Sequence, residues 1–96
     1  MQNTISLSSK IRINEEIVSR NLQGEMVLLN LKTNAYYGLD HMGSRIWQLI
    51  NENKSLKKVL HRLLEEYDVP KENCTRDLLT LVNSLKEKEI ILECRK

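Results

Sequence analysis

The chain has 96 residues and a net charge of +2, which suits one domain with a single modest core and is far from the basic excess of a dedicated nucleic-acid-binding domain. No apolar run approaches the roughly 20 residues that span a bilayer, and the polar N-terminus lacks the pattern of a secretory signal. We therefore expect one cytoplasmic domain over residues 1–96, with residues 1–9 flexible and both cysteines present as free thiols.

The first part of the sequence predicts a β-meander. Apolar residues recur in Lys10–Asn21 and predict a strand near Ile17–Arg20, which an extended segment can precede. Gly24 can then take the positive φ of a tight turn. Glu25–Leu31 follows with apolar residues on both faces, which is typical of a central strand that is covered partly on each side.

A third, short strand is predicted at Ala35–Leu39, after a turn in which Asn34 can take the left-handed conformation. Tyr37 and Leu39 alternate onto one face, which we expect to meet the core. Because this strand ends the meander, one side of it should present unpaired N–H and C=O groups. Gly38 would let another backbone approach that side closely.

Helices are predicted after the strands, so the fold class is α+β. Asp40 can cap the first helix and Ser55 the second, since their side-chain oxygens can accept from free N–H groups of the first turn. The apolar residues of the second helix recur at the spacing of a helix that packs on one side.

The third helix is expected to run from about residue 71 or 73 to residue 88. Its expected core stripe consists of Cys74, Leu78, Leu81, Val82 and Leu85. Leu79 lies about 100° round this helix from Leu78. Together with Val82, it is expected to border a second contact surface next to the sheet edge. A short extended tail should then pack Ile90 and Leu92 back on the core.

The sequence contains no constellation that predicts catalysis. His41 follows a helix cap and His61 borders an apolar stripe, and no nucleophile motif surrounds Cys74 or Cys94. No glycine-rich phosphate loop, metal-ligand cluster or carboxylate constellation occurs. We therefore expect a protein that is not an enzyme and that uses no cofactor or metal.

Several of these residues carry a family resemblance that covers nearly the whole chain from Ile17 onwards. The chain resembles the PqqD-like family, and the tyrosine pair followed by Leu39 belongs to the most specific part of the match. Two positions depart from the family pattern, since Asn34 replaces a turn glycine and Glu89 replaces the glycine that usually closes the last helix. The matching positions are Gly24, Glu25, Val27, Leu28, Leu29, Asn30, Leu31, Lys32, Thr33, Tyr36, Tyr37, Gly38, Leu39, Gly43, Ser44, Ile46, Trp47, Ser55, Leu56, Tyr67, Asp68, Val69, Asp77, Leu78, Leu81 and Leu85.

The resemblance implies a winged helix-turn-helix domain, in which a three-stranded antiparallel sheet is followed by three helices. It also implies a RiPP recognition element, a domain that binds the leader segment of a ribosomally made precursor peptide. The leader would add as a further strand beside the third strand and lie in a groove against the third helix. The chain is particularly similar to the standalone leader-binding proteins of lasso-peptide biosynthesis, where a partner enzyme such as a cysteine protease cuts the presented precursor.

This mechanism suggests which residues would meet a leader, because edge pairing supplies main-chain hydrogen bonds and side-chain pockets supply specificity. The main-chain partner is expected at residues 34–38, with an apolar wall at Leu79 and Val82. Asp77 either joins the site or faces the positive end of its helix dipole. The expected peptide-binding residues are Asn34, Ala35, Tyr36, Tyr37, Gly38, Thr75, Arg76, Leu79, Val82, Asn83 and Lys86.

Two alternatives remain open. Winged helices commonly bind DNA, but the basic residues of the third helix are matched by acidic neighbours and lack the excess needed for phosphate contacts. Two free sheet edges could instead pair. We expect a monomer or an edge-paired dimer that binds neither nucleic acid nor membrane.

Overall fold

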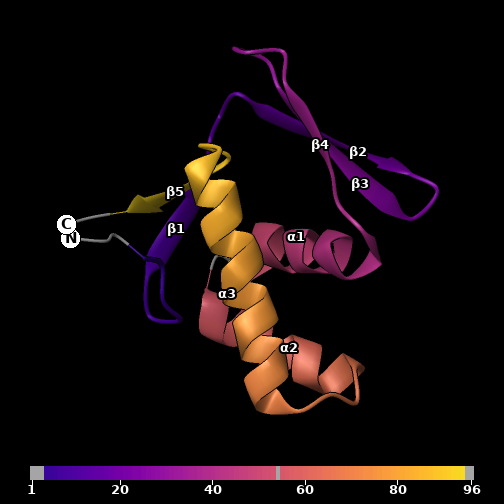
Figure 1. Cartoon of the computed structure of the whole chain (residues 1–96), viewed down its shortest axis with the longest axis vertical. Helices are drawn as coiled ribbons and strands as arrows, with labels where there is room; N and C mark the ends of the chain where they lie inside the picture. The colour runs from indigo at the N-terminus through magenta and orange to yellow at the C-terminus, as the bar shows by residue number, and fades with distance from the viewer. Residues whose placement is uncertain (1–3, 54, 95–96) are drawn as a thin grey trace.

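The computed structural model describes residues 4–53 and 55–94 (Figure 1). A three-stranded antiparallel sheet of order β2-β3-β4 precedes three helices, which confirms the α+β, winged helix-turn-helix arrangement. The elements are β1 (Lys10–Ile13), β2 (Ile17–Leu22), β3 (Glu25–Asn30), β4 (Tyr36–Gly38), α1 (His41–Asn53), α2 (Leu56–Glu66), α3 (Lys71–Glu87) and β5 (Ile91–Cys94).

The turns of the meander take the backbone conformations that their sequences predict. Gln23 and Gly24 both have positive φ, 56° and 91°, between the paired residues Leu22 and Glu25. This is the two-residue hairpin turn whose twist matches the flanking strands. Asn34 has φ of 65°, so the expected pivot of the second turn is confirmed.

A second sheet joins the two ends of the described chain. The extended segment β1 pairs antiparallel with β5, from Lys10 opposite Cys94 to Ile13 opposite Ile91. The sequence indicated both segments but not their pairing, because pairing between distant strands leaves no local signal. In the tail, Ile90 and Ile91 are fully buried and Leu92 is only half-buried, so Ile91 takes the core position that was expected for Leu92.

The described part of the N-terminal segment departs from the expected flexible lead-in. Ile5 is only 1% exposed and belongs to the core. Its N–H donates to Asn83 Oδ1 over 2.8 Å, and Asn83 Nδ2 donates back to the Ile5 carbonyl over 3.2 Å. The Asn83 side chain on α3 therefore holds this segment through both main-chain groups of Ile5.

The helices bury their apolar stripes against one another and against β3. Leu28 of β3, Leu49 of α1, Leu63 of α2 and Leu78 of α3 are each 0% exposed. Two side-chain oxygens cap the helices as expected: Asp40 Oδ1 accepts from the Gly43 N–H over 2.8 Å, and Ser55 Oγ accepts from the Lys58 N–H over 3.5 Å. Within the described ranges, no helix is both long and apolar enough to cross a bilayer.

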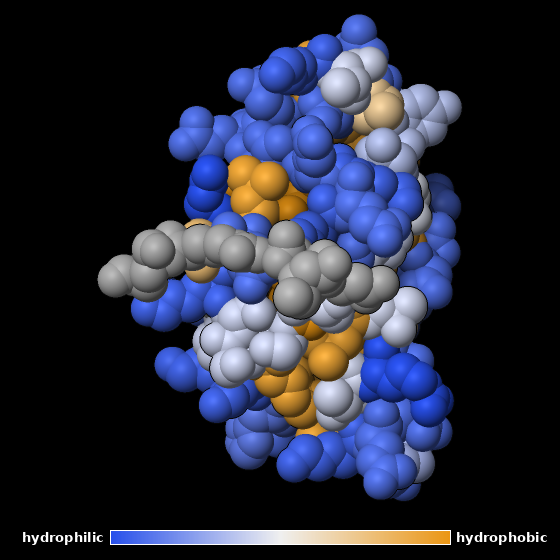
Figure 2. All heavy atoms as spheres, turned by 60° about the vertical axis from the view of Figure 1, so that its left-hand side comes forward, coloured by the Kyte–Doolittle hydropathy of each residue, from blue (hydrophilic) through white to orange (hydrophobic). Residues whose placement is uncertain are grey.

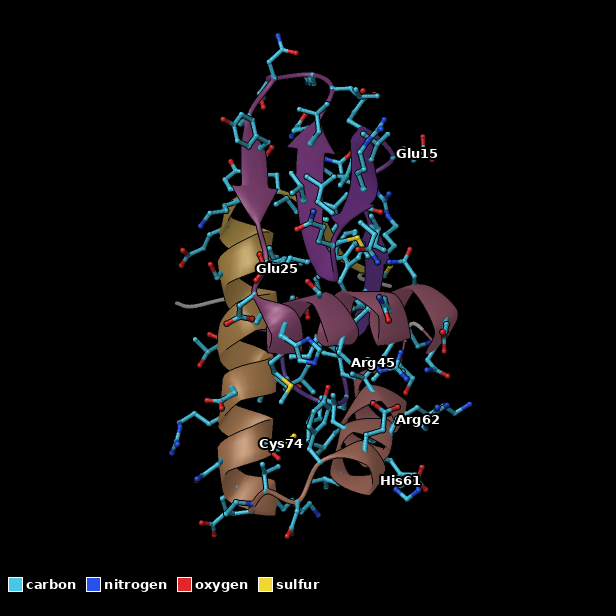
Figure 3. All side chains as sticks on the ribbon, turned by 90° about the vertical axis from the view of Figure 1, so that its right-hand side faces the viewer. Glu15, Glu25, Arg45, His61, Arg62 and Cys74 are labelled. Carbon is cyan, nitrogen blue, oxygen red and sulfur yellow. The ribbon has the colours of Figure 1, made fainter. Side chains whose placement is uncertain are left out.

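An ion pair joins α1 to α2 on the surface. Arg45 Nε donates to Glu66 Oε1 over 2.8 Å, and Arg45 Nη2 contacts the other carboxylate oxygen. This hydrogen bond lowers the pKa of Glu66 and raises that of Arg45. Figure 3 shows Arg45 and Arg62 in the region between α1 and α2. Arg62 Nη2 lies 3.6 Å from Glu66 Oε2, so it adds a second, weaker partner.

Candidate functional site

The third strand of the meander, β4, has a free edge. Among residues 4–53 and 55–94 it pairs only with β3, in the order Leu28 opposite Tyr37 and Leu29 opposite Tyr36. The Leu39 N–H donates to the Met26 carbonyl over 2.8 Å, next to this ladder. Because the groups that face a partner strand alternate along the chain, residues 35, 37 and 39 turn towards β3. The N–H and C=O groups of Tyr36 and Gly38 therefore point outward, away from the sheet.

A buried serine holds the end of β4 against β3 and α1. Ser44 is 2% exposed, and its Oγ accepts from the Met26 N–H over 2.7 Å and donates to the Leu39 carbonyl over 3.2 Å. The hydroxyl thus satisfies two main-chain groups that would otherwise be buried without partners. It also ties the first turn of α1 to the strand that carries the free edge.

The other end of β4 is held by a turn built on Asn30. Asn30 is 7% exposed, and its Oδ1 accepts from the N–H groups of Lys32 and Thr33 over 2.9 and 3.2 Å. Its own N–H donates to the Ala35 carbonyl over 2.8 Å. The strand is therefore only three residues long but is fixed at both ends.

A groove of about 380 Å³ lies between the start of α1 and the side of α3 that runs past β4. At the far end of this side, Lys88 Nζ lies 5.6 Å from the centroid of the Tyr37 ring. Gly43 keeps the groove open, because a Cβ there would lie 3.1 Å from Asp40 Oδ1 and 3.6 Å from Leu81 Cδ2. The groove is lined by Asp40, Met42, Gly43, Ile46, Asp77, Thr80, Leu81 and Ser84.

The structure brings together the expected residues of the strand but not those of the helix. Residues 34–38 lie on β4 and its turn, with Tyr36 73% exposed and Tyr37 half-buried. Val82 is 0% exposed and belongs to the core, so it forms no surface wall. Leu79 lies on the opposite flank of α3 from Leu81, because residues two positions apart in a helix point about 200° apart around its axis.

The remaining expected residues of α3 follow Leu79 to that opposite flank, which faces the N-terminal segment and β5. Asn83 holds Ile5, and Lys86 Nζ lies 3.3 Å from Glu93 Oε1. Arg76 lines a second groove of about 800 Å³ with Leu79, Asn83 and Lys86, and Thr80 and Ser84 line both grooves, so the two adjoin along α3. Thr75 is half-buried near the start of the helix. The structure thus corrects the expected position of these residues relative to the sheet edge.

The part of α3 that faces β4 differs from the part that the sequence predicted. Leu81 was assigned to the core stripe, but it is half-buried and lines the groove with Ser84 and Thr80. Asp77, for which a binding role and a dipole role were both considered, also lines this groove. The hydrophobic pattern gives the buried face of a helix and leaves open which of its two flanks meets a given strand.

The reactive side chains of the described residues lie apart from this site. No group of three His, Cys, Asp or Glu side chains within the described ranges could hold a metal ion. Cys74 is 6% exposed, and burial together with the nearby Asp77 charge raises the pKa of its thiol, which lowers its reactivity. His61 is exposed and lies 3.0 Å from Glu65 on its own helix. What the site offers is a row of main-chain groups beside an open groove.

Comparison with known proteins gives a family and similar solved structures. The family described as coenzyme PQQ synthesis protein D (PqqD) matches residues 25–91. A solved structure described as TbiB1 in complex with the TbiA(beta) leader peptide is similar, with a TM-score of 0.82, 35% sequence identity, and coverage of 88% of this chain and 99% of that one.

A second solved structure, described as lasso peptide synthetase B1 complexed with the leader peptide, is also similar. It has a TM-score of 0.78 and 31% identity, and the match covers 86% of this chain and 98% of that one. A search of the curated proteins found no match. The family match spans more than half of the chain and includes β3, β4, α1, α2 and α3. The chain therefore belongs to the PqqD family.

Proposed function

We propose that this protein is a non-catalytic adaptor that binds the leader segment of a ribosomally made precursor peptide. The leader adds as a fourth strand beside β4 and pairs with the outward N–H and C=O groups of Tyr36 and Gly38. The observation that carries the proposal is this free edge, held rigid by Ser44 and Asn30 beside an open groove. Two similar proteins, each bound to a leader peptide in its solved structure, support it.

The groove supplies the specificity that main-chain pairing lacks. Edge pairing reads no side chains, so selection among peptides depends on the pockets that alternate side chains enter. Leu81 and Met42 offer apolar contacts there, and Ser84, Thr80 and Asp77 offer polar ones. Because β4 directs only two residues outward, the contact is short, and a leader that orders on binding should bind with moderate affinity.

The adaptor role includes a second partner, an enzyme that acts on the presented precursor. Within the described ranges no group of His, Cys, Asp or Glu side chains could hold a metal ion, and Cys74 is buried with a raised thiol pKa, which supports a partner protein as the source of the chemistry. We place this step in the cytoplasm, a reducing compartment in which Cys74 and Cys94 stay free thiols, as they are in the structure.

Calorimetry with a synthetic leader tests the proposal, using two matched variants of α3. Leu81→Glu puts a charge in the groove beside β4, and Leu79→Glu puts the same charge on the other flank of the same helix. Both leucines are half-buried, so the two variants should cost similar stability. We expect Leu81→Glu to weaken leader binding at least tenfold and Leu79→Glu to leave it nearly unchanged.

Hydrogen exchange gives the complementary measurement. With the leader at saturation, the amides of Tyr36 and Gly38 should gain protection, because they would enter a new ladder. Unchanged exchange at both amides, or weakening by Leu79→Glu alone, would contradict strand addition beside β4.

A further inference from the structure

The free edge of β4 is open to a second copy of this chain as well as to a peptide. Figure 3 shows β4 at one side of the three strands, with no further strand beyond it. Tyr36 and Gly38 each point an N–H and a C=O outward from this edge. Proteins commonly block such an edge with a lysine, a proline or a bulge, and β4 contains none of these. The edge is therefore a template for pairing whenever no leader covers it.

One antiparallel register makes this edge complementary to itself. When Tyr37 of one copy lies opposite Tyr37 of the other, Tyr36 of each copy lies opposite Gly38 of its partner. Every outward N–H of one β4 strand then meets an outward C=O of the other across a two-fold axis. The neighbouring registers place Asn34 or Asp40 opposite these residues and leave half of the groups unpaired, because Asn34 lies in a turn and Asp40 caps α1.

The same register places an aromatic ring beside an open pocket. Gly38 lines a pocket of about 370 Å³ with Leu22 and Val27, and a Cβ added at Gly38 would meet no atom within 4 Å. Residues opposite each other share a face of the sheet, so Tyr36 of the second copy lies next to Gly38, on the face that carries Val27. Tyr36 is 73% exposed and is free to fill this space. An aromatic side chain packed against a glycine of the neighbouring strand stabilises a sheet edge.

Exposed apolar side chains are concentrated on this sheet. Of the large apolar residues that are exposed in the described ranges, only Val69 lies outside the β2-β3-β4 sheet and its turns; the others are Val18, Leu22, Leu31 and Tyr36. Figure 2 looks onto the side of the molecule with β1 and β5, and most of the surface visible there is hydrophilic. The apolar surface that a second copy can cover therefore lies on the sheet that carries the free edge.

We propose that two copies of this chain pair through their β4 edges in this register, so that each Tyr36 fills the pocket beside Gly38 of the other copy. The pair uses the same N–H and C=O groups that were assigned above to the leader, so a second copy and a leader exclude each other. The free adaptor thus covers its own edge, and the leader separates the two copies when it binds. Only this last step rests on the leader binding proposed above.

The size of the contact makes the dimer a transient one. An aromatic side chain buries about 150–250 Å², so two tyrosines and two short strands bury less than the roughly 1,200 Å² at which stable interfaces begin. Weak self-association suits the proposed role, because a leader that orders on binding has only moderate affinity and must still displace the second copy.

Sedimentation equilibrium of the purified chain tests the proposal with two matched variants. Leu22 lines the pocket beside Gly38, whereas Leu31 lies beyond the other end of β3, and both are 53% exposed. We expect the wild type to form a dimer as its concentration rises to about 1 mM. Leu22→Ser should weaken dimerisation about tenfold and Leu31→Ser should leave it within about twofold. A wild type that stays monomeric, or a dimer that Leu31→Ser weakens and Leu22→Ser does not, overturns the inference.

A cysteine at the two-fold axis tests the register. In the proposed dimer the two Cα atoms of residue 37 lie about 4.5 Å apart, which a disulfide can span. In a Cys94→Ser background, Tyr37→Cys should therefore cross-link on mild oxidation. Val18→Cys should not, because Val18 lies on β2, the strand farthest from the free edge. A folded Tyr37→Cys variant that does not cross-link overturns the inference.

A synthetic leader separates this inference from the adaptor function. At saturation it should convert the dimer into monomers that each carry one peptide. A leader that binds while the dimer persists overturns this inference and leaves the adaptor function standing. A chain that forms the dimer in this register and binds no leader overturns the adaptor function alone.

Discussion

Replacing Gly38 with proline should block leader binding while sparing the fold. The Gly38 N–H points away from β3, so proline removes no hydrogen bond of the existing sheet, and proline is tolerated at such positions of edge strands. Gly38→Ala is the control. A Cβ at this position meets no atom within 4 Å, and alanine keeps the outward N–H.

The expected loss of leader affinity follows from the hydrogen-bonding groups at the edge of β4. One main-chain hydrogen bond contributes about 1 kcal/mol net, and a leader carbonyl left without its donor in the contact costs about 1–3 kcal/mol more. The sum of about 2–4 kcal/mol corresponds to a dissociation constant raised at least about thirtyfold. Calorimetry measures it, and fluorescence of Trp47, the single tryptophan and only 2% exposed, reports whether the variant is folded. A folded Gly38→Pro variant that binds leader as Gly38→Ala does would refute the edge as the binding element.

Three further predictions concern stability, each measured by urea unfolding. Ser44→Ala leaves the buried Met26 N–H without an acceptor and should lower the free energy of unfolding by about 1–3 kcal/mol; a neutral result would mean that the hydroxyl does not hold β4. Glu89→Gly should raise the free energy of unfolding by about 1 kcal/mol, because Glu89 has φ of 61° at the end of α3. A lower free energy of unfolding in this variant would contradict backbone strain at Glu89. Glu66→Gln should cost about 0.5–1 kcal/mol at pH 7. Arg45 lowers the pKa of Glu66, so the difference in stability should be complete above the ordinary pKa of the carboxyl and vanish as the pH falls through the lowered value. A difference that did not shrink as the pH was lowered would exclude the ion pair as its source.

The sequence predicted those parts of the fold that depend on local rules. Positive φ at Gly24 and Asn34, the caps at Asp40 and Ser55, and the free third strand all follow from residue types at short spacing. The glycine expected at the end of α3 is missing, yet Glu89 still takes the left-handed conformation. The chain direction at that point is therefore set by tertiary packing of the tail, against the preference of the residue.

The strand part of the site was predicted from the sequence, whereas the helix part was not. Period-2 alternation placed Tyr37 inward and Tyr36 outward correctly, because a strand has only two faces. A helix has a continuous circumference, and the flank that meets β4 depends on how α3 crosses the sheet. That crossing depends on contacts between residues far apart in the sequence, such as the hydrogen bonds of Asn83 with Ile5.

The pairing of β1 with β5 has a practical consequence for how the domain can be attached to other proteins. Lys10 lies opposite Cys94, and Figure 1 shows the β1–β5 pair on the far side of α3 from β4. A tether at either end, or insertion of the whole unit into a loop of a larger enzyme, would leave the strand that meets the peptide unobstructed. Fusion proteins can therefore carry a tag or a catalytic domain beside the β1–β5 pair without blocking the free edge of β4.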